Sequence, residues 1–160
     1  MPGLDDLYRE IILDHYRSPR NRGELAPPAV RAEGHNPLCG DEIQVYLDVV
    51  DGVVNDIKIT GSGCSISLSS ASMMSQAVKG KKIADVKALV NRFRSMMGLD
   101  NADSDNDVVS IEDDTEVEAP EVKLGDLEAL QGVVKFPVRI KCATLAWITL
   151  TQAMAEVPNA

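Results

Sequence analysis

The chain has 160 residues and a formal net charge of −9; 44% of the residues are hydrophobic and only 4% are aromatic. This length and composition favour one globular domain with its own core. No apolar run reaches the ~20 residues that cross a bilayer, and the N-terminal segment lacks the basic and apolar parts of a signal peptide. We therefore expect a cytoplasmic protein. No membrane contact is expected, and because no basic stripe is present, no nucleic acid contact is expected either.

The first half of the chain predicts one helix followed by a β-hairpin. Residues 4–17 form an amphipathic pattern whose apolar face has Leu4, Leu7, Tyr8, Ile11, Ile12 and His15. An irregular, proline-containing loop follows this helix. Two segments rich in valine and isoleucine, 42–50 and 53–60, then flank Asp51-Gly52. A pair of such segments around Asp-Gly is typical of a β-hairpin.

The second half predicts helices. One begins near Cys64 or Ser65 and ends at Gly80, a second spans 82–97, and a short one lies near 124–131. The last helix has Pro137 in its first turn and runs to about Val157. A helix, a hairpin and then helices indicate an α+β fold, in which helices cover one face of a small antiparallel β-sheet.

The negative charge is concentrated in one segment. Residues 98–128 hold 12 acidic residues and one base, so that the rest of the chain has 13 acidic and 15 basic residues. We interpret residues 98–122 as an acidic insert in a single domain that spans 1–160. The insert has no cysteine or histidine and lacks the spaced ligands of a calcium loop, so we expect it to be peripheral to the chemistry.

Three cysteines and one aspartate are the candidate site residues. Cys39 and Asp41 flank a glycine, Cys64 follows Gly-Ser-Gly at a predicted helix start, and Cys142 lies near the start of the last helix. Thiolates and a carboxylate are suitable zinc ligands, and a helix N-terminus favours a thiolate. Spacing alone leaves another interpretation open, since an isolated cysteine is most often a small buried hydrophobe.

The two histidines are weaker candidates. His35 is close to Cys39 in the sequence and is a possible fourth ligand, but a loop histidine is usually only solvated. His15 falls on the apolar face of the first helix, where a packed and hydrogen-bonded role is the default.

Four segments together resemble one family. They are LYREIILDHYRSPRNRG, NPLCGDEI, GSGCSISLSSASMM and RIKCATLAW, spread over nearly the whole chain. The sequence is similar to the SufU-type iron–sulfur cluster assembly proteins, in the superfamily of IscU and NifU-type domains. This resemblance implies the same compact α+β fold.

The resemblance also implies a site and a function. It implies that Cys39, Asp41, Cys64 and Cys142 bind Zn²⁺ and that Cys39 accepts persulfide sulfur from a SufS-type cysteine desulfurase, which makes the protein a sulfurtransferase. It further implies that Arg139 engages the desulfurase, and that the downstream partners are other cluster assembly proteins.

The alternative is a scaffold on which iron or a [2Fe–2S] cluster is assembled and passed to apoproteins. Thiolate ligands suit both centres. In IscU scaffolds a histidine directly precedes the last cysteine, whereas Lys141 occupies that position here. This departure favours sulfur transfer.

Overall fold

The computed structural model describes residues 4–37, 40–98 and 124–157. The prediction for the acidic insert at 98–122 therefore lies almost entirely outside the described residues. The elements are α1 (Leu4–Arg17), β1 (Val30–Asn36), β2 (Asp41–Val50), β3 (Val53–Ser62), α2 (Ser65–Val78), α3 (Ile83–Met96), the 3₁₀ helix η1 (Gly125–Lys135) and α4 (Pro137–Glu156). No helix in these ranges is long and apolar enough to span a membrane.

The three strands form an antiparallel sheet in the order β1-β2-β3. The turn between β2 and β3 has positive φ at both Asp51 and Gly52, 53° and 74°, as a type I′ hairpin turn requires. Alternate side chains of β2, including Ile43, Val45 and Leu47, are buried, whereas the residues between them remain partly exposed. The predicted hairpin is therefore confirmed, and so is the expectation that one face of the sheet is covered.

Strand β1 was not predicted. It is an edge strand that pairs only with β2, and of its seven residues only Ala32 and Asn36 are buried. An edge strand with so little apolar area has no clear alternation of polar and apolar residues, so the sequence pattern does not reveal it.

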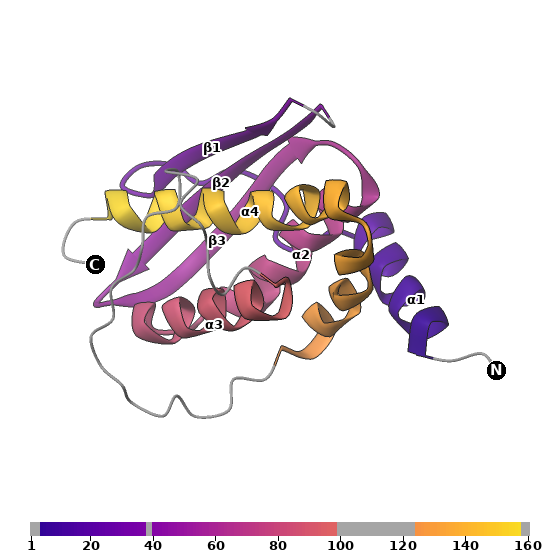
Figure 1. Cartoon of the computed structure of the whole chain (residues 1–160). Coiled ribbons are helices and arrows are strands. Elements are labelled where there is room, and N and C mark those ends of the chain that lie inside the picture. The colour runs from indigo at the N-terminus through magenta and orange to yellow at the C-terminus, as the bar shows by residue number, and fades with distance from the viewer. Residues whose placement is uncertain (1–3, 38–39, 99–123, 158–160) are drawn as a thin grey trace.

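The helices form a layer on the buried face of the sheet. Helix α4 packs across β1 and β2, and α2 packs against β3 and against α4 (Figure 1). The Phe93 ring of α3 stacks on Trp147 of α4 with their centroids 4.4 Å apart, an arrangement that adds to the burial of both rings. The α+β fold is thus the predicted one.

The helix bounds agree with the sequence patterns within a few residues, with two differences. The predicted short helix is a longer 3₁₀ helix, η1, that ends at Lys135. The predicted apolar face of α1 is wrong at Leu7, whose side chain is 56% exposed, although Tyr8, Ile11 and Ile12 pack against the core. Helix α1 contacts mainly α2 and η1, and these two elements cover only a narrow stripe of it.

His15 joins three elements through its buried ring. Its Nε2 lies 2.9 Å from Asp126 of η1, and its Nδ1 lies 2.8 Å from the Ser72 hydroxyl of α2. Because a carboxylate only accepts hydrogen bonds, Nε2 donates to Asp126. The same hydroxyl accepts the backbone N–H of Arg20 at 2.9 Å. The packed role predicted for His15 is therefore confirmed.

We expect His15→Ala to destabilise the protein by about 2–4 kcal/mol, because it creates a cavity and removes two buried hydrogen bonds. The free energy of unfolding in urea measures this. His35→Ala is the matched control; its side chain is 53% exposed, so we expect less than about 0.5 kcal/mol. Equal losses for the two variants would contradict a structural role for the His15 network.

Candidate metal centre

Asp41 is the first residue of β2, and its carboxylate points inward at the start of that strand. The residue is 1% exposed, and Oδ1 accepts the backbone N–H of Cys64 at 2.9 Å. The approach is close, since a Cβ at Gly63 would overlap the Asp41 carboxylate. Gly63, the residue before Cys64, thus allows the start of β2 and the start of α2 to meet at this carboxylate.

Cys64 is the N-cap residue of α2. Its Sγ accepts the backbone N–H of Ser67 at 3.5 Å and lies 3.9 Å from Oδ2 of Asp41. The sulfur takes the place of the oxygen of a serine or aspartate cap. The cap thus places the sulfur beside the Asp41 carboxylate, and both groups are ordinary zinc ligands.

Cys142 belongs to the second turn of α4 and is fully buried. The side-chain amide of Asn36 donates to its Sγ at 3.8 Å. Asn36 is the last residue of β1 and pairs with Asp41 across the sheet. This buried contact ties the last residue of β1 to the Cys142 sulfur, so the end of β1 also supports the site.

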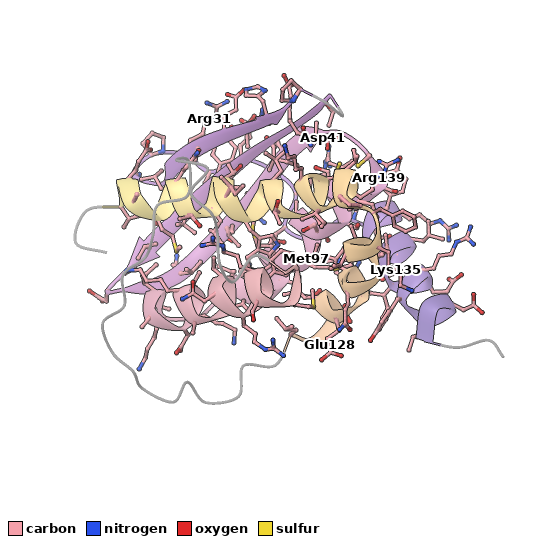
Figure 2. The ribbon with its side chains drawn as sticks, in the orientation of Figure 1. Arg31, Asp41, Met97, Glu128, Lys135 and Arg139 are labelled. Atoms are coloured by element: carbon pink, nitrogen blue, oxygen red, sulfur yellow. The ribbon has the colours of Figure 1, made fainter. Side chains whose placement is uncertain are left out.

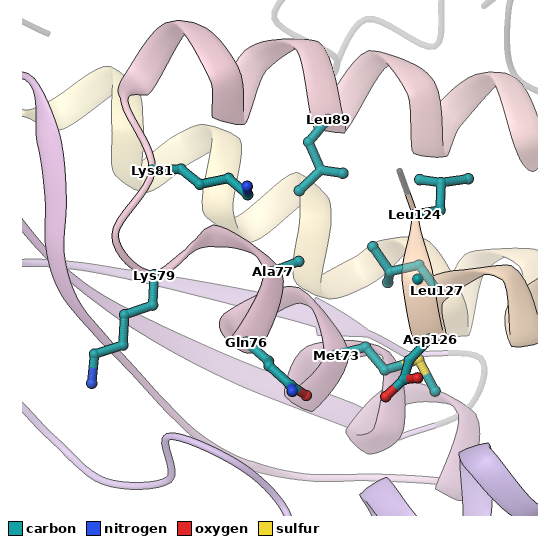
Figure 3. A pocket seen from close by; sticks show the side chains of 10 residues that line it. Met73, Gln76, Ala77, Lys79, Lys81, Leu89, Leu124, Asp126 and Leu127 are labelled. Atoms are coloured by element: carbon teal, nitrogen blue, oxygen red, sulfur yellow. The ribbon is translucent and has the colours of Figure 1, made fainter. Parts of the chain in front are cut away.

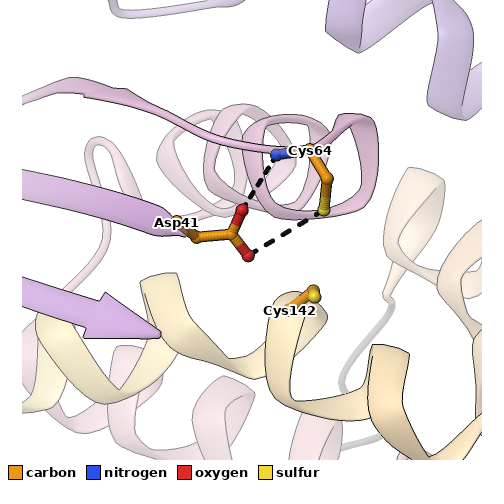
Figure 4. A group of neighbouring side chains, drawn as sticks. All are labelled: Asp41, Cys64 and Cys142. Atoms are coloured by element: carbon orange, nitrogen blue, oxygen red, sulfur yellow. Dashed lines mark hydrogen bonds between the residues drawn. The ribbon is translucent and has the colours of Figure 1, made fainter. Parts of the chain in front are cut away.

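The three side chains form one donor group. The Asp41 carboxylate and the sulfurs of Cys64 and Cys142 lie within 4.8 Å of one another (Figure 4). Zinc bond lengths and tetrahedral angles require ligand atoms about 3.5–3.8 Å apart. Two thiols and one carboxylate at the observed separations therefore fit Zn²⁺ after a small contraction, and they leave a fourth position for one more ligand.

The three other candidate residues are Cys39, Arg139 and His35. Cys39, the predicted acceptor and fourth ligand, lies outside the described residues; Gly40 beside it has φ +69°, a conformation that glycine adopts readily. Arg139 is exposed, one turn before Cys142 on α4, and lies at the same end of the molecule as Asp41 (Figure 2). The structure does not place His35 with the three ligands, because its ring nitrogens face Glu33 and Glu42 at 2.9 and 3.3 Å.

A pocket of about 430 Å³ lies elsewhere, between α2, α3 and η1. Its walls include Met73, Leu89 and Leu127 (Figure 3). Asp126 also lines it but is held by His15. None of the three donor residues lines this pocket, so the pocket and the donor group are separate features of the described structure.

Sequence reasoning missed Asn36. The residue stands in the quoted segment NPLCGDEI, but asparagine before proline is an ordinary turn signal. Its role is visible only once β1 is known to pair with β2, because that pairing carries its amide toward Cys142. The role of Asn36 follows from its contact with Cys142, 106 positions later in the sequence, and no local sequence pattern indicates such a contact.

The chain is thus an α+β domain in which two thiols and a carboxylate that could hold a metal ion gather at one end of the sheet. Residues 7–159 match the model of the NifU-like N terminal domain, and the chain belongs to this family.

Two relatives and one solved structure illustrate the family. The chain is 45% identical to the zinc-dependent sulfurtransferase SufU of Bacillus subtilis, over 96% of this chain and 92% of that one. It is 36% identical to the iron–sulfur cluster assembly scaffold protein IscU of Thermotoga maritima, over 94% of each. The crystal structure of a putative iron–sulfur cluster assembly scaffold protein for the SUF system from Fervidobacterium islandicum superposes with a TM-score of 0.70 at 26% identity, over 95% of this chain and 99% of that one.

We expect the protein to bind one zinc ion per chain. We expect Gly63→Ala to weaken that binding by about tenfold or more, because the new methyl group displaces the Asp41 carboxylate from its position. Competition with a chromophoric chelator measures the affinity. Gly132→Ala is the matched control, since a Cβ there meets nothing within 4 Å. Unchanged zinc affinity in the Gly63 variant would show that this carboxylate is not a ligand.

Proposed function

We propose that the protein works in iron–sulfur cluster assembly as a zinc-dependent sulfur carrier. In this role Cys39 accepts sulfur from the persulfide of a SufS-type cysteine desulfurase and passes it to other assembly proteins. The observation that carries the proposal is the convergence of the buried Asp41 and Cys142 with the half-buried Cys64. The 45% identity to a zinc-dependent sulfurtransferase over nearly the full length supports it.

The transfer is a thiolate–disulfide type of exchange. The Cys39 thiolate attacks the outer sulfur of the desulfurase persulfide and forms a new S–S bond. The original S–S bond breaks, and its electron pair leaves on the desulfurase cysteine as a thiolate. Cys39 then carries the persulfide, and no external oxidant or reductant is consumed.

The described residues are suited to support this exchange. Asp41, Cys64 and Cys142, with Cys39 as the fourth ligand, are the residues that would hold the metal. Zinc, when bound, keeps such thiols deprotonated. The backbone N–H of Ser67 and the amide of Asn36 stabilise the same charged sulfurs from the protein side. Asp41, the single hard ligand of the set, neighbours the acceptor cysteine in sequence with one glycine between them.

A second candidate function is a scaffold for a [2Fe–2S] cluster. The 36% identity to an IscU scaffold protein favours it, and cysteine thiolates hold such clusters. The protein as purified separates the two candidates. Colourless protein with stoichiometric zinc that stimulates a desulfurase supports sulfur transfer, whereas a stable brown cluster that is passed to an apoprotein supports the scaffold.

We expect Cys39→Ala to abolish persulfide acceptance, because it removes the attacking thiolate. Asp41→Ala keeps that thiolate and should change zinc affinity and transfer rate instead. Each variant is mixed with a persulfide-loaded cysteine desulfurase, and the transferred sulfur is located by mass spectrometry. Normal acceptance by the Cys39 variant, on Cys64 or Cys142, would make the assignment of the acceptor wrong.

We expect Arg139→Ala to raise the concentration needed for half-maximal stimulation of the desulfurase by about tenfold, since arginine is a frequent anchor of protein interfaces. Zinc content should be unchanged because Arg139 is not one of the proposed ligands. Arg92→Ala, an exposed arginine of α3, is the matched control and should behave as the wild type. Equal effects of the two variants would argue against a docking role for Arg139.

A further inference from the structure

We propose that Ser67 is a positioning residue of the metal centre, whose hydroxyl donates a hydrogen bond to the thiolate of Cys142 when the metal is bound. The inference rests on the metal site proposed above. It concerns a side chain that no ligand set includes, and it comes from an anomaly in helix α2.

The anomaly is a buried hydroxyl without a partner. Ser67 is 0% exposed, and its Oγ makes no hydrogen bond to the residues that the structure describes. Other buried serines of α2 do find partners. Ser69 donates to the carbonyl of Ser65, Ser70 to the carbonyl of Ala143, and Ser75 to the carbonyl of Ser72. The helix therefore offers its serines acceptors of this kind, and Ser67 alone among these four uses none.

The N-cap of α2 offers Ser67 no local partner. Ser67 is the third residue after the N-cap Cys64, where a glutamate or glutamine often reaches back to the N-cap backbone N–H. Here that N–H donates to Asp41 at 2.9 Å. A capping contact at the start of the helix is thus made by the carboxylate of the donor group and not by Ser67.

The position of Ser67 points to Cys142. Residues three apart share one face of a helix, so Ser67 lies one turn before Ser70 on the face that contacts α4. Ser70 bonds to the carbonyl of Ala143, the residue after Cys142. The backbone N–H of Ser67 already donates to the Cys64 sulfur, which lies within 4.8 Å of the Cys142 sulfur. The backbone of Ser67 therefore contacts one sulfur of the donor group, and its side chain lies on the helix face toward α4, the helix that carries the other sulfur.

The acceptor available to the hydroxyl differs between the metal-free and metal-bound states. A neutral thiol is a weak acceptor, so the metal-free protein leaves the hydroxyl unsatisfied, which is unfavourable for a buried group. Metal binding converts the thiol to a thiolate, and hydrogen bonds to a charged acceptor are the stronger kind. Ser67 thus disfavours the metal-free state and favours the metal-bound one.

The opposite effects of Ser67 on the stability of the metal-free and metal-bound states provide the test. Zinc-free Ser67→Ala should unfold at the same temperature as the wild type or a higher one, while its zinc affinity falls by about tenfold, as for other residues that support metal ligands. With Co²⁺ in place of zinc, the sulfur-to-cobalt charge-transfer band should move to longer wavelength, because the thiolate loses a hydrogen bond. Calorimetry, chelator competition and absorption spectra measure the three effects.

Ser69→Ala is the matched control, since Ser69 is equally buried but bonded to Ser65. It should lower the unfolding temperature of the zinc-free and zinc-bound forms alike and leave the cobalt spectrum unchanged. A Ser67→Ala protein with wild-type zinc affinity and cobalt spectrum would overturn the role of Ser67. Failure of the wild type itself to bind zinc would instead overturn the metal site.

Discussion

The hydrogen bond between the buried Asp41 carboxylate and the backbone N–H of Cys64 is the contact on which the site depends. A carboxylate that is 1% exposed is costly unless it is hydrogen-bonded, and this bond fixes the start of β2 against the start of α2 at 2.9 Å. The contact requires glycine at position 63, because a side chain there would occupy the same space. Once the two element ends are joined, Cys64 faces Asp41, and α4, packed on the same sheet, brings Cys142 to them.

Helix α2 explains how a small domain holds such a polar site in place. Its packed face is rich in serine, and the hydroxyls make directed contacts that apolar side chains cannot make. Ser70 bonds to the α4 backbone and accepts the indole N–H of Trp147, whereas Ser72 bonds to His15 and to the loop after α1. Directional bonds fix the orientation of a helix about its own axis more strictly than burial alone does. The orientation of Cys64 is set in this way.

The sequence predicted most of the scaffold but only part of the site. The hairpin and helices α2, α3 and α4 carry strong local signals. These are Asp51-Gly52 for the hairpin, apolar spacing for α3, the flanking glycines for α2 and Pro137 for the start of α4. Strand β1 carries almost none, because its pairing and not its composition defines it. The family resemblance selected Asp41, Cys64 and Cys142, which the structure brings together. Asn36 and Ser67 could not be selected, since their roles depend on contacts between elements that are distant in sequence.

Helix α4 carries both Arg139, the proposed docking residue, and Cys142, a member of the donor group. Arg139 is exposed to solvent, and Cys142, one turn later, is fully buried beside the carboxylate. Residues three apart lie on neighbouring parts of a helix surface, so a partner that binds the arginine sits within one turn of the sulfur. Helix α4 also packs across β1 and β2, and β2 begins at Asp41. The exposed arginine and the two buried donor side chains, Asp41 and Cys142, are therefore connected through one turn of a helix and its packing on the sheet.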